Sequence, residues 1–309
     1  MTDNVTARRA WYAEDLGLRA PIRRNRAIID AFGRVPRERF LGAGPWRLLP
    51  DTRPDLPFTT PNDDPAWLYH DVLVTIDAAR GLNNGMPSFW AKNFDHLDLE
   101  PGRRVLQVGA GTGYYSAVLA ELVGPDGRVT AVEFDAGLAA KARDNLAAWK
   151  QVEVIHGDGR THDPGDVDIV VVFAGATHPS PLWLDRLTPG GQLLMPLTAG
   201  RWFGFLLLVT RPQRPDNSQI IMPESRDANR FEARSIGGVG IFPCAGGRDE
   251  EAATRLEQAL DQMASEARRS RLPPDIPIEA LHRGDPGPGV EARVWYSAPG
   301  FWLERKSAD

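Results

Sequence analysis

The stretch VLQVGAGTGYYSAVLAELVGPDGRVTAVEFD (105–135) decides the fold that this sequence predicts. An apolar run of strand length turns through GAGTG (109–113) into a helical segment, and a second apolar run follows at 128–135. Glycines at such a turn let the chain bend tightly, let a ligand approach the backbone, and point the amides of the helix N-terminus into the cleft. The stretch therefore predicts a strand, a glycine-rich turn, a helix and a second strand.

The segments that follow keep this alternation of strand and helix. Further strands are predicted at 152–160, 168–176, 192–197 and 203–211, and further helices at 136–150 and 181–187, the second ended by a TPGG turn (188–191). The strands are continuous apolar runs, which is typical of a parallel sheet covered on both faces. We therefore expect an α/β, Rossmann-like fold with a seven-stranded, mostly parallel sheet and helices on both faces.

The sequence before and after this strand–helix alternation divides the chain into three predicted segments. Residues 1–99 form an N-terminal helical cap and substrate loop, 100–247 the core, and 248–309 a C-terminal extension. Within these segments we expect a helix over 6–41, an irregular covering segment or lid at 42–65, a strand at 71–77, a helix at 87–99, an amphipathic helix at 248–269 and a hairpin at 290–306. The extension and the segment 42–65 could bind a leader or partner protein, and the hairpin could form a homodimer surface.

Composition excludes several classes of function. The 309 residues are 42% hydrophobic and 25% charged, with a net charge of -5, which does not favour general affinity for nucleic acids. The single cysteine, Cys244, cannot form an internal disulfide, a cysteine-based zinc site or an iron–sulfur cluster. The longest apolar run, FGFLLLV (203–209), has strand length, so no membrane span is expected. We expect a cytoplasmic protein without a metal site.

Two carboxylates make the glycine-rich turn more informative. Glu133 ends the second strand of the motif, where an acid can accept bonds from both ribose hydroxyls. Asp158 in HGDGR ends the third strand, where a carboxylate can meet an adenine amino group. The combination predicts adenosyl binding. A dinucleotide is the alternative, although Tyr114 stands where its fingerprint has a third glycine; glycines that merely turn the chain are another.

The order and spacing of these motifs resemble the protein-L-isoaspartate O-methyltransferases. The resemblance rests on 105–135, on HGDGR (156–160) and on VDIVVVFAGATHPSPLWLDRLTPGGQLLMPL (167–197), and VPRERF (35–40) and Tyr69-His70-Asp71 before VLVTI extend it. It implies S-adenosylmethionine as cofactor, with S-adenosylhomocysteine as product. The predicted cofactor-binding residues are Gln107, Gly109, Ala110, Gly111, Thr112, Gly113, Tyr114, Glu133, Phe134, Gly157, Asp158, Gly159 and Ala174. For Tyr114, stacking on the cofactor and packing of the helix both stay open.

The chain departs from this family at its substrate loop. The family reads roughly G-Q-T-I-S-x-P there, and its Thr and Ser line the methyl-transfer pocket, whereas residues 81–87 are GLNNGMP. Asn83 stands at the Thr position and Gly85 at the Ser position, with Asn84 between them. Asn amides could still hold a carboxylate or a peptide backbone, and a plain Asn-Gly turn is the alternative. His178, after the fourth strand, is a candidate base or substrate contact, or a hydrogen-bonded histidine at the rim.

The expected activity is O-methylation of an Asp or isoaspartate carboxylate in a peptide or protein. Either repair or programmed modification of a biosynthetic peptide would fit, and the altered loop puts the standard repair specificity in doubt. A nucleic-acid amino methyltransferase is disfavoured because AGATHP (174–179) lacks an N-P-P-Y type sequence. The alternatives are a small-molecule O-methyltransferase and a non-catalytic protein that binds S-adenosylmethionine.

Overall fold

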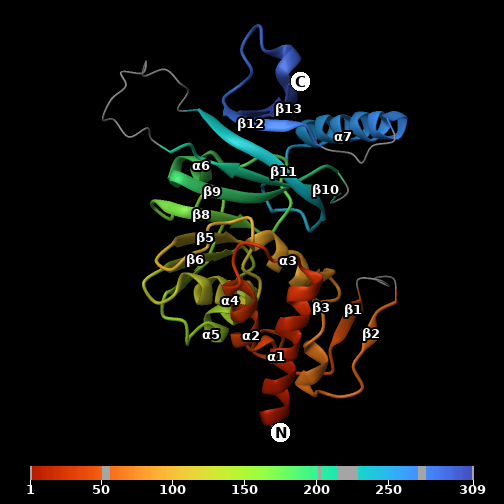
Figure 1. The fold of residues 1–309 in the computed structure, drawn as a ribbon, viewed down its shortest axis with the longest axis vertical. Coiled ribbons are helices and arrows are strands. Elements are labelled where there is room, and N and C mark those ends of the chain that lie inside the picture. Colours follow the sequence, from red (N-terminus) through yellow and green to blue (C-terminus); the bar gives the residue numbers. More distant parts are fainter. Residues whose placement is uncertain (1, 51–55, 201–202, 214–228, 271–275, 308–309) are drawn as a thin grey trace. The chain divides into compact units, whose positions relative to one another are not determined.

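The computed structural model of the chain describes residues 2–50, 56–200, 203–213, 229–270 and 276–307. The chain divides into two compact units, Met1–Val105 with Ala110–Gly157, and Leu106–Gly109 with Asp158–Asp309. Figure 1 follows the elements from α1 to β13 along the chain. Strand β5 (Arg104–Val108) passes from the first unit into the second. The boundaries of these two units differ from those of the three segments expected from the sequence, 1–99, 100–247 and 248–309. The division into three functional segments stays a prediction.

Helices form the N-terminal part of the first unit. They are α1 (Thr2–Arg19), α2 (Ala27–Arg34), the short 3-10 helix η1 (Arg37–Phe40) and α3 (Pro87–Phe94), which packs against α1 and α2. The single helix expected over 6–41 is therefore interrupted twice. Pro21 and Pro36 lie in the two interruptions, where proline lacks an amide hydrogen and restricts the preceding residue. The amides freed after Pro21 bond instead to the Asp95 carboxylate, those of Arg23 and Asn25 both at 2.8 Å.

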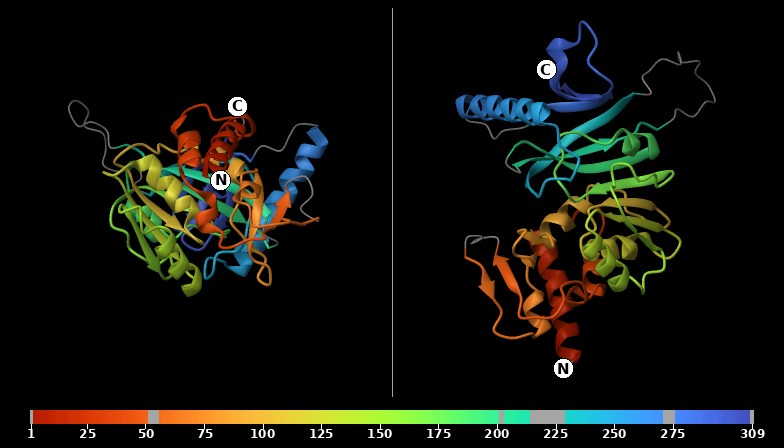
Figure 2. Two further views of the ribbon diagram at one scale, coloured as in Figure 1. Left: turned by 90° about the horizontal axis from the view of Figure 1, so that it is seen from below. Right: turned by 180° about the vertical axis from the view of Figure 1, so that it is seen from behind.

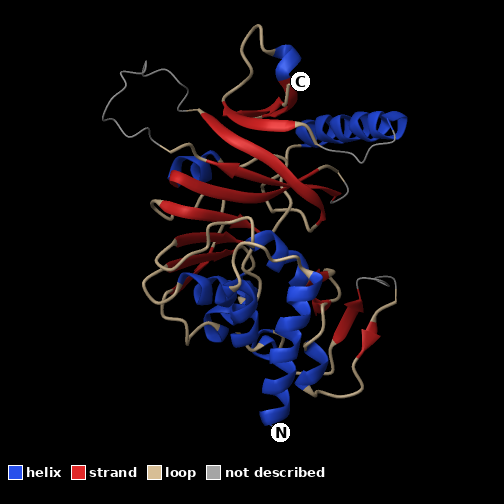
Figure 3. Ribbon diagram, viewed as in Figure 1, coloured by secondary structure: helices blue, strands red, loops and turns tan. Residues whose placement is uncertain are grey.

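A small antiparallel sheet lies in the same unit. Its strands β1 (Arg47–Pro50), β2 (Phe58–Thr59), β3 (Val72–Asp77) and β4 (Leu82–Asn83) have the order β2-β1-β3-β4, and η2 (Pro65–Leu68) precedes β3. Figure 3 shows these strands in red beside the helices of the unit. The segment 42–65 is thus not irregular throughout, because two of its stretches are strands; residues 51–55 lie outside the described part.

The predicted motif is present in the first unit and continues into the second. After β5 come α4 (Tyr114–Val123), β6 (Arg128–Glu133), α5 (Ala136–Asn145) and β7 (Val152–His156). Strands β6 and β7 are parallel, with Val129 opposite Val152 and Glu133 opposite His156. The carboxyl ends of these strands therefore meet at one edge, as expected from the sequence.

The second unit contains a longer, mixed run of strands. Its elements are β8 (Val167–Val172), α6 (Pro181–Arg186), β9 (Leu187–Thr198), β10 (Phe203–Thr210), β11 (Arg230–Gly240), α7 (Glu250–Ser270), β12 (Ile278–Arg283), η3 (Glu291–Arg293), β13 (Val294–Ala298) and β14 (Phe301–Arg305). The strand order is β13-β14-β12-β11-β10-β9-β8. Helix α7 packs against β13 and lies beside it in both Figure 1 and the right panel of Figure 2.

The expectation of a mostly parallel, seven-stranded sheet is wrong. In the second unit only the β8–β9 pair is parallel among the described pairings, and the pairs from β9 to β13 are antiparallel. Strand β12 was not expected, and the hairpin predicted at 290–306 extends the sheet as β13 and β14. The predicted TPGG turn lies inside β9, where Ile169 faces Gln192 two residues after Val167 faces Leu187. The turn is a bulge in a strand and does not separate a helix from one.

Candidate functional site

The glycine-rich turn requires glycine at alternate positions. Gly109, Gly111 and Gly113 have φ of 84°, 59° and 96°, in the left-handed region where side chains are strained. A Cβ on Gly113 would lie 2.7 Å from Leu146 Cδ1, so this glycine also lets α5 pack against the turn. A Cβ on Gly111 would meet no atom within 4 Å, so the space beside it is open. The turn can therefore present its backbone to a ligand.

The Glu133 carboxylate holds this turn from the end of β6. Its oxygens accept the Gly111 amide at 2.7 Å and the Asp135 amide at 2.9 Å. Glu133 is 8% exposed, and burial raises its pKa more than these amide bonds lower it. Since a carboxylate has about four acceptor positions, it keeps acceptor capacity for hydroxyl groups of a ligand. The geometry suits the predicted role in binding a ribose.

The Asp158 turn belongs to the second unit. Asp158 Oδ1 accepts the Arg160 amide at 2.8 Å, and the Asp158 carbonyl accepts the amides of Thr161 and His162. Among the described residues, Oδ2 has no hydrogen-bond partner. The Gly159 carbonyl accepts Trp183 Nε1–H at 2.8 Å, and a Cβ on Gly159 would lie 2.7 Å from Val108. The turn is thus tightly packed behind a carboxylate oxygen that can accept an amino group.

The other predicted cofactor residues fall into three groups: buried side chains, one exposed ring, and positions at the turns. Gln107 and Tyr114 are buried, Gln107 completely and Tyr114 with its ring edge-on to Phe40 at a centroid distance of 5.7 Å. Those contacts account for Tyr114 as a packing residue, and a cofactor contact for it stays a prediction. Phe134, in contrast, is 60% exposed directly after Glu133, which leaves its ring accessible to a ligand. The remaining positions are at the turns. Gly157 donates its amide to the Glu133 carbonyl, and the Thr112 carbonyl accepts a hydrogen bond from Asn145 Nδ2. Ala174 is half-buried and follows β8.

The predicted substrate loop is the end of a hairpin. Asn83 belongs to β4, and its Oδ1 accepts the Gly85 amide at 2.9 Å. Asn84 Oδ1 accepts the Val74 amide at 2.9 Å, and Asn84 is only 8% exposed. Asn84 is therefore mainly used to close the hairpin, whereas the half-buried Asn83 keeps its amide nitrogen free among the described contacts. The two carboxamides, similar in sequence, have different surroundings.

Gly85 explains why this loop has no serine at the family's position. Its φ is 78°, and a Cβ there would lie 2.8 Å from Trp90 Nε1 and 3.2 Å from a ring carbon of Tyr115. Tyr115 also donates its hydroxyl to the Gly85 carbonyl at 3.1 Å. Trp90 and Tyr115 thus occupy the space that a side chain would need. The missing hydroxyl is a consequence of packing in this chain.

Arg37 holds the β3–β4 hairpin through hydrogen bonds, and the sequence analysis did not single it out. It is fully buried, and its guanidinium donates to the carbonyls of Leu68, His70 and Val72 at 2.7, 2.8 and 2.6 Å. It also reaches Asn84 Oδ1 at 3.4 Å. The one signal in the sequence is its place in VPRERF (35–40), a stretch that resembles the family. Arg37 fixes the chain on both sides of β3.

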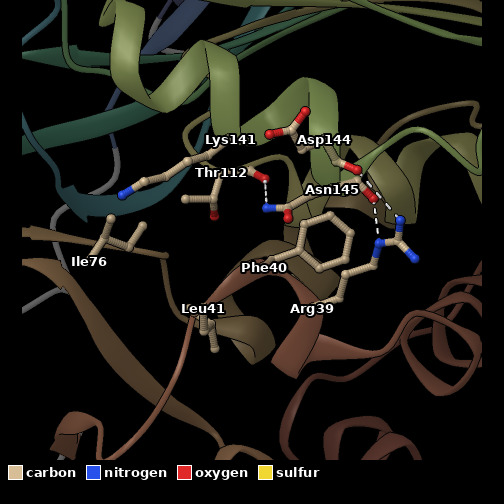
Figure 4. A pocket seen from close by; sticks show the side chains of 9 residues that line it. Arg39, Phe40, Leu41, Ile76, Thr112, Lys141, Asp144 and Asn145 are labelled. Carbon is tan, nitrogen blue, oxygen red and sulfur yellow. Dashed lines mark hydrogen bonds between the residues drawn. The ribbon is translucent and has the colours of Figure 1, made fainter.

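A pocket of about 250 Å³ opens beside Thr112 in the first unit. Figure 4 shows Thr112 and Asn145 on one side, Ile76 of β3 on another, and Arg39 bonded to the backbone of α5. The lining residues are Arg39, Phe40, Leu41, Gly42, Ile76, Thr112, Lys141, Asp144 and Asn145. Arg80, at the turn of the hairpin, bonds to Asp135 at 2.9 Å, next to Glu133. The hairpin, the VPRERF segment and the glycine-rich turn therefore surround one space.

His178 has partners at both ring nitrogens. Nε2 lies 2.8 Å from Arg160 Nη2 and Nδ1 lies 2.9 Å from Thr177 Oγ1. Burial lowers the pKa of His178, and Arg160 lowers it further. Because a guanidinium can only donate, Nε2 is an acceptor and the ring is neutral. The geometry supports the hydrogen-bonded rim histidine, while a base or substrate contact at His178 stays an untested prediction.

In the described part of the chain, no group of three or more His, Cys, Asp or Glu side chains is placed to hold a metal ion. No helix among the same residues is both long and apolar enough to cross a membrane.

Comparisons with known proteins give a consistent set of relatives. The family model of Protein-L-isoaspartate(D-aspartate) O-methyltransferase matches residues 62–224. The protein-L-isoaspartate O-methyltransferase of Methanothermobacter thermautotrophicus is 31% identical over 228 residues, 72% of this chain and 88% of the relative. That of Methanopyrus kandleri is 36% identical over 181 residues, 57% of this chain and 70% of the relative.

Solved structures show the same fold. A protein-L-isoaspartate O-methyltransferase structure has a TM-score of 0.58 at 16% identity and covers 99% of this chain and 88% of its own. A Plasmodium falciparum methyltransferase in complex with S-adenosyl-L-homocysteine has a TM-score of 0.56 at 18% identity and covers 76% and 97%. At these identities the likeness concerns the fold, an α/β methyltransferase fold with a mixed sheet.

Proposed function

Because this chain belongs to the protein-L-isoaspartate (D-aspartate) O-methyltransferase family, we propose that it methylates a side-chain carboxylate of a peptide or protein. The methyl donor is S-adenosylmethionine, and the acceptor is Asp or isoaspartate. One observation supports this most directly: the Glu133 carboxylate binds the amide of Gly111 and so joins the strand-end acid to the glycine-rich turn. The methyl acceptor class follows the names of the relatives.

Each unit, taken by itself, has residues that suit a part of an adenosyl group. Glu133 keeps acceptor positions for ribose hydroxyls, and the open space beside Gly111 and Gly157 leaves room for a ligand against the backbone. The exposed ring of Phe134 offers an apolar surface, and Asp158 Oδ2 offers an acceptor for an amino group. When bound, the cofactor supplies an electrophilic methyl on a sulfonium.

The reaction on the acceptor requires orientation more than proton transfer. A carboxylate is already an anion at neutral pH, so the chain needs donors that aim one oxygen along the line of displacement. Asn83 is such a donor, because its Oδ1 is bonded to the Gly85 amide and its amide nitrogen is left for a substrate. A carboxylate oxygen held in this way would accept the methyl group that the bound cofactor supplies, and no residue of the chain would have to remove a proton. The absence of a free ring nitrogen on His178 is compatible with this chemistry.

Ester formation also explains what happens to the peptide afterwards. The following backbone nitrogen can close on the ester carbonyl, and methanol leaves as a succinimide forms. Repair of isoaspartate and programmed modification of a biosynthetic peptide both proceed through this step. In this chain the loop has an amide in place of the family's hydroxyls, which favours an acceptor recognised through its carboxylate and backbone.

Transfer of a tritiated methyl group tests the proposal. Isoaspartyl peptide, matched aspartyl peptide, a cell extract and small carboxylic acids are each offered as acceptors. We expect label in peptide or protein that alkali releases as methanol, as esters do and methylated amines do not. Tight binding of S-adenosylhomocysteine without label in any acceptor would identify a non-catalytic binding protein. Label confined to the organic-soluble fraction would identify a small-molecule enzyme.

Substitution of the two loop asparagines is expected to separate catalysis from folding. Asn83→Ala should lower kcat/KM for the peptide about tenfold, the effect of one hydrogen bond, with little loss of stability. Asn84→Ala should instead cost roughly 2 kcal/mol of stability, because the Val74 amide loses its acceptor. Peptide kinetics and urea unfolding of both variants measure this. Wild-type kinetics for Asn83→Ala would show that the loop is not the substrate loop.

Further parts of the proposal concern the surroundings of the site. The N-terminal helices are proposed to act as a cap, since η1 supplies Arg39 and Phe40 to the pocket beside Thr112. A cytoplasmic site of action is supported by the single cysteine, which forms no internal disulfide. Association into homodimers through the C-terminal extension stays a prediction.

A further inference from the structure

Thr177 is held almost entirely by residues from the C-terminal segment, which we define as residues 246–309. Its amide donates to the Gly247 carbonyl at 3.1 Å, its Oγ1 accepts the Asp249 amide at 3.0 Å, and its carbonyl accepts the Tyr296 hydroxyl at 2.8 Å. Thr177 is fully buried. The C-terminal segment lies beyond residues 62–224, which the family model matches. A segment outside the family-model match thus fixes a residue inside that match.

His178, the next residue, connects Thr177 to Arg160 in the turn that follows β7. His178 Nδ1 lies 2.9 Å from Thr177 Oγ1, and Nε2 accepts from Arg160 at 2.8 Å. With Nε2 as acceptor, the proton of the neutral ring is on Nδ1 and points to Thr177. The ring therefore has one orientation. Thr177 fixes it through Nδ1, and Arg160 donates a hydrogen bond to Nε2 of the ring in that orientation.

Arg160 links the ring to Asp158. Its Nη1 donates to the carbonyl of Gly246, and its Nη2 donates to His178. Its own amide donates to Asp158 Oδ1 at 2.8 Å, and its carbonyl accepts the Ser180 hydroxyl at 2.7 Å. Asp158 is held by a residue whose side chain is in turn held from the C-terminal segment. The rotation of the Asp158 carboxylate decides where Oδ2 points.

Tyr296 is the outermost member of this chain of hydrogen bonds. It is 3% exposed, and burial raises its pKa, so its hydroxyl stays protonated and donates. Its ring lies edge-on to Phe301 at a centroid distance of 5.7 Å, across the β13–β14 hairpin. The ring is therefore fixed before its hydroxyl meets Thr177.

We propose that the C-terminal segment orders the cofactor-binding turn Asp158–Arg160 through Thr177 and His178, and that Tyr296 is a positioning residue for cofactor binding. The inference rests on the proposed function, because it takes Asp158 to accept a bond from the adenosyl group. It assigns the C-terminal segment a part in the enzyme's own site, whether or not the segment also binds a partner. Tyr296 itself touches neither cofactor nor substrate.

The test measures the affinity for S-adenosylhomocysteine by calorimetry at a temperature where circular dichroism shows every variant folded. We expect Tyr296→Phe, which removes only the hydroxyl, to weaken binding about three- to tenfold, the effect of one hydrogen bond. The KM for peptide should not change. Thr177→Val, which removes the contact to His178 Nδ1, should weaken binding by a similar factor and serves if Tyr296→Phe does not fold.

Two further variants separate positioning from a general loss of stability. Tyr69→Phe removes another buried tyrosine hydroxyl, bonded to Glu38 in the first unit, and should leave the affinity within about twofold of wild type. The double variant Tyr296→Phe with His178→Gln should lose less affinity than the product of the single losses, since both act through Arg160. If the loss of affinity in the double variant equals the product of the two single losses, the path through His178 is contradicted.

The outcomes distinguish this inference from the proposed function. Unchanged affinity in Tyr296→Phe and Thr177→Val, with a wild-type chain that binds S-adenosylhomocysteine, would overturn the inference and leave the proposed function intact. A wild-type chain that does not bind it would overturn both. An equal loss in Tyr69→Phe would show that any lost tyrosine hydroxyl has the same effect and would also overturn the inference.

Discussion

Replacing Arg37 with Met is expected to lower the free energy of unfolding by roughly 3 to 5 kcal/mol, because it leaves several buried acceptors without a donor. The guanidinium donates to three carbonyls, at Leu68, His70 and Val72, and reaches Asn84. Water cannot replace it at a fully buried site. The hairpin that carries Asn83 should lose its fixed position, so turnover should fall together with stability.

Urea unfolding of matched variants measures this effect. Arg34→Met is the control, because Arg34 precedes Arg37 by three residues, is exposed, and bonds to Glu121 at 2.7 Å. A surface pair of this kind contributes up to about 1 kcal/mol. Arg37→Lys should not restore stability, since an ammonium cannot reproduce the planar fork that meets several carbonyls. A loss below about 1 kcal/mol in Arg37→Met would show that the buried guanidinium's own desolvation outweighs its bonds.

Replacing Glu133 with Ala is expected to weaken S-adenosylhomocysteine binding roughly 100-fold. Two hydrogen bonds from hydroxyl groups to a carboxylate account for about 3 kcal/mol, and the Gly111 amide also loses the acceptor that orders the turn. Titration calorimetry gives the affinity directly. Glu153→Gln is the matched control, since Glu153 lies on the neighbouring strand, is exposed and pairs with Arg128. Binding within about threefold of wild type would remove Glu133 from the site.

The pKa of Glu133 adds a pH dependence with a defined sign. Burial raises this pKa above its usual value of 4.5, and the ribose hydroxyls need the ionised form. Affinity for the cofactor should therefore fall as pH falls through the raised pKa, at a higher pH than for an exposed glutamate. Stability without cofactor has the opposite sign, because a raised carboxyl pKa favours the folded state at low pH. Glu133→Gln should abolish this drop in affinity at low pH. If the affinity of the variant still falls at the same pH, another group is responsible for the drop.

The cofactor motif could be predicted from the sequence because its physics is local. Three glycines with positive φ, an acid at the end of β6 and a second at the end of β7 lie within about 50 residues, and parallel strands bring their carboxyl ends together. The β3–β4 hairpin was missed as a hairpin, because β4 has only two residues and polar side chains. The sequence singles out Asn83 and Asn84 as candidates for the substrate loop, whereas their different surroundings depend on the contact that Asn84 makes with Val74 of β3.

The antiparallel part of the sheet could not be predicted with the same rules. Strands β9 and β10 are apolar on both faces in sequence, as parallel strands are, and only their pairing shows that β10 runs antiparallel to β9. Strand β12 follows a proline-rich stretch that indicated a break. The link from Tyr296 to Thr177 spans 119 residues, and no local pattern indicates it.

The sequence by itself determined the α/β class, the glycine-rich turn, its two acids and the family, because each depends on residue types at short, fixed spacings. Only the tertiary structure decided which side chains those elements leave available. Trp90 and Tyr115 exclude a side chain at position 85, and Arg37 takes up the carbonyls around β3. Arg160 and Thr177 take up both nitrogens of His178. Such contacts join segments far apart in the chain, and burial and hydrogen bonding depend on what lies within a few ångströms rather than on what lies nearby in sequence.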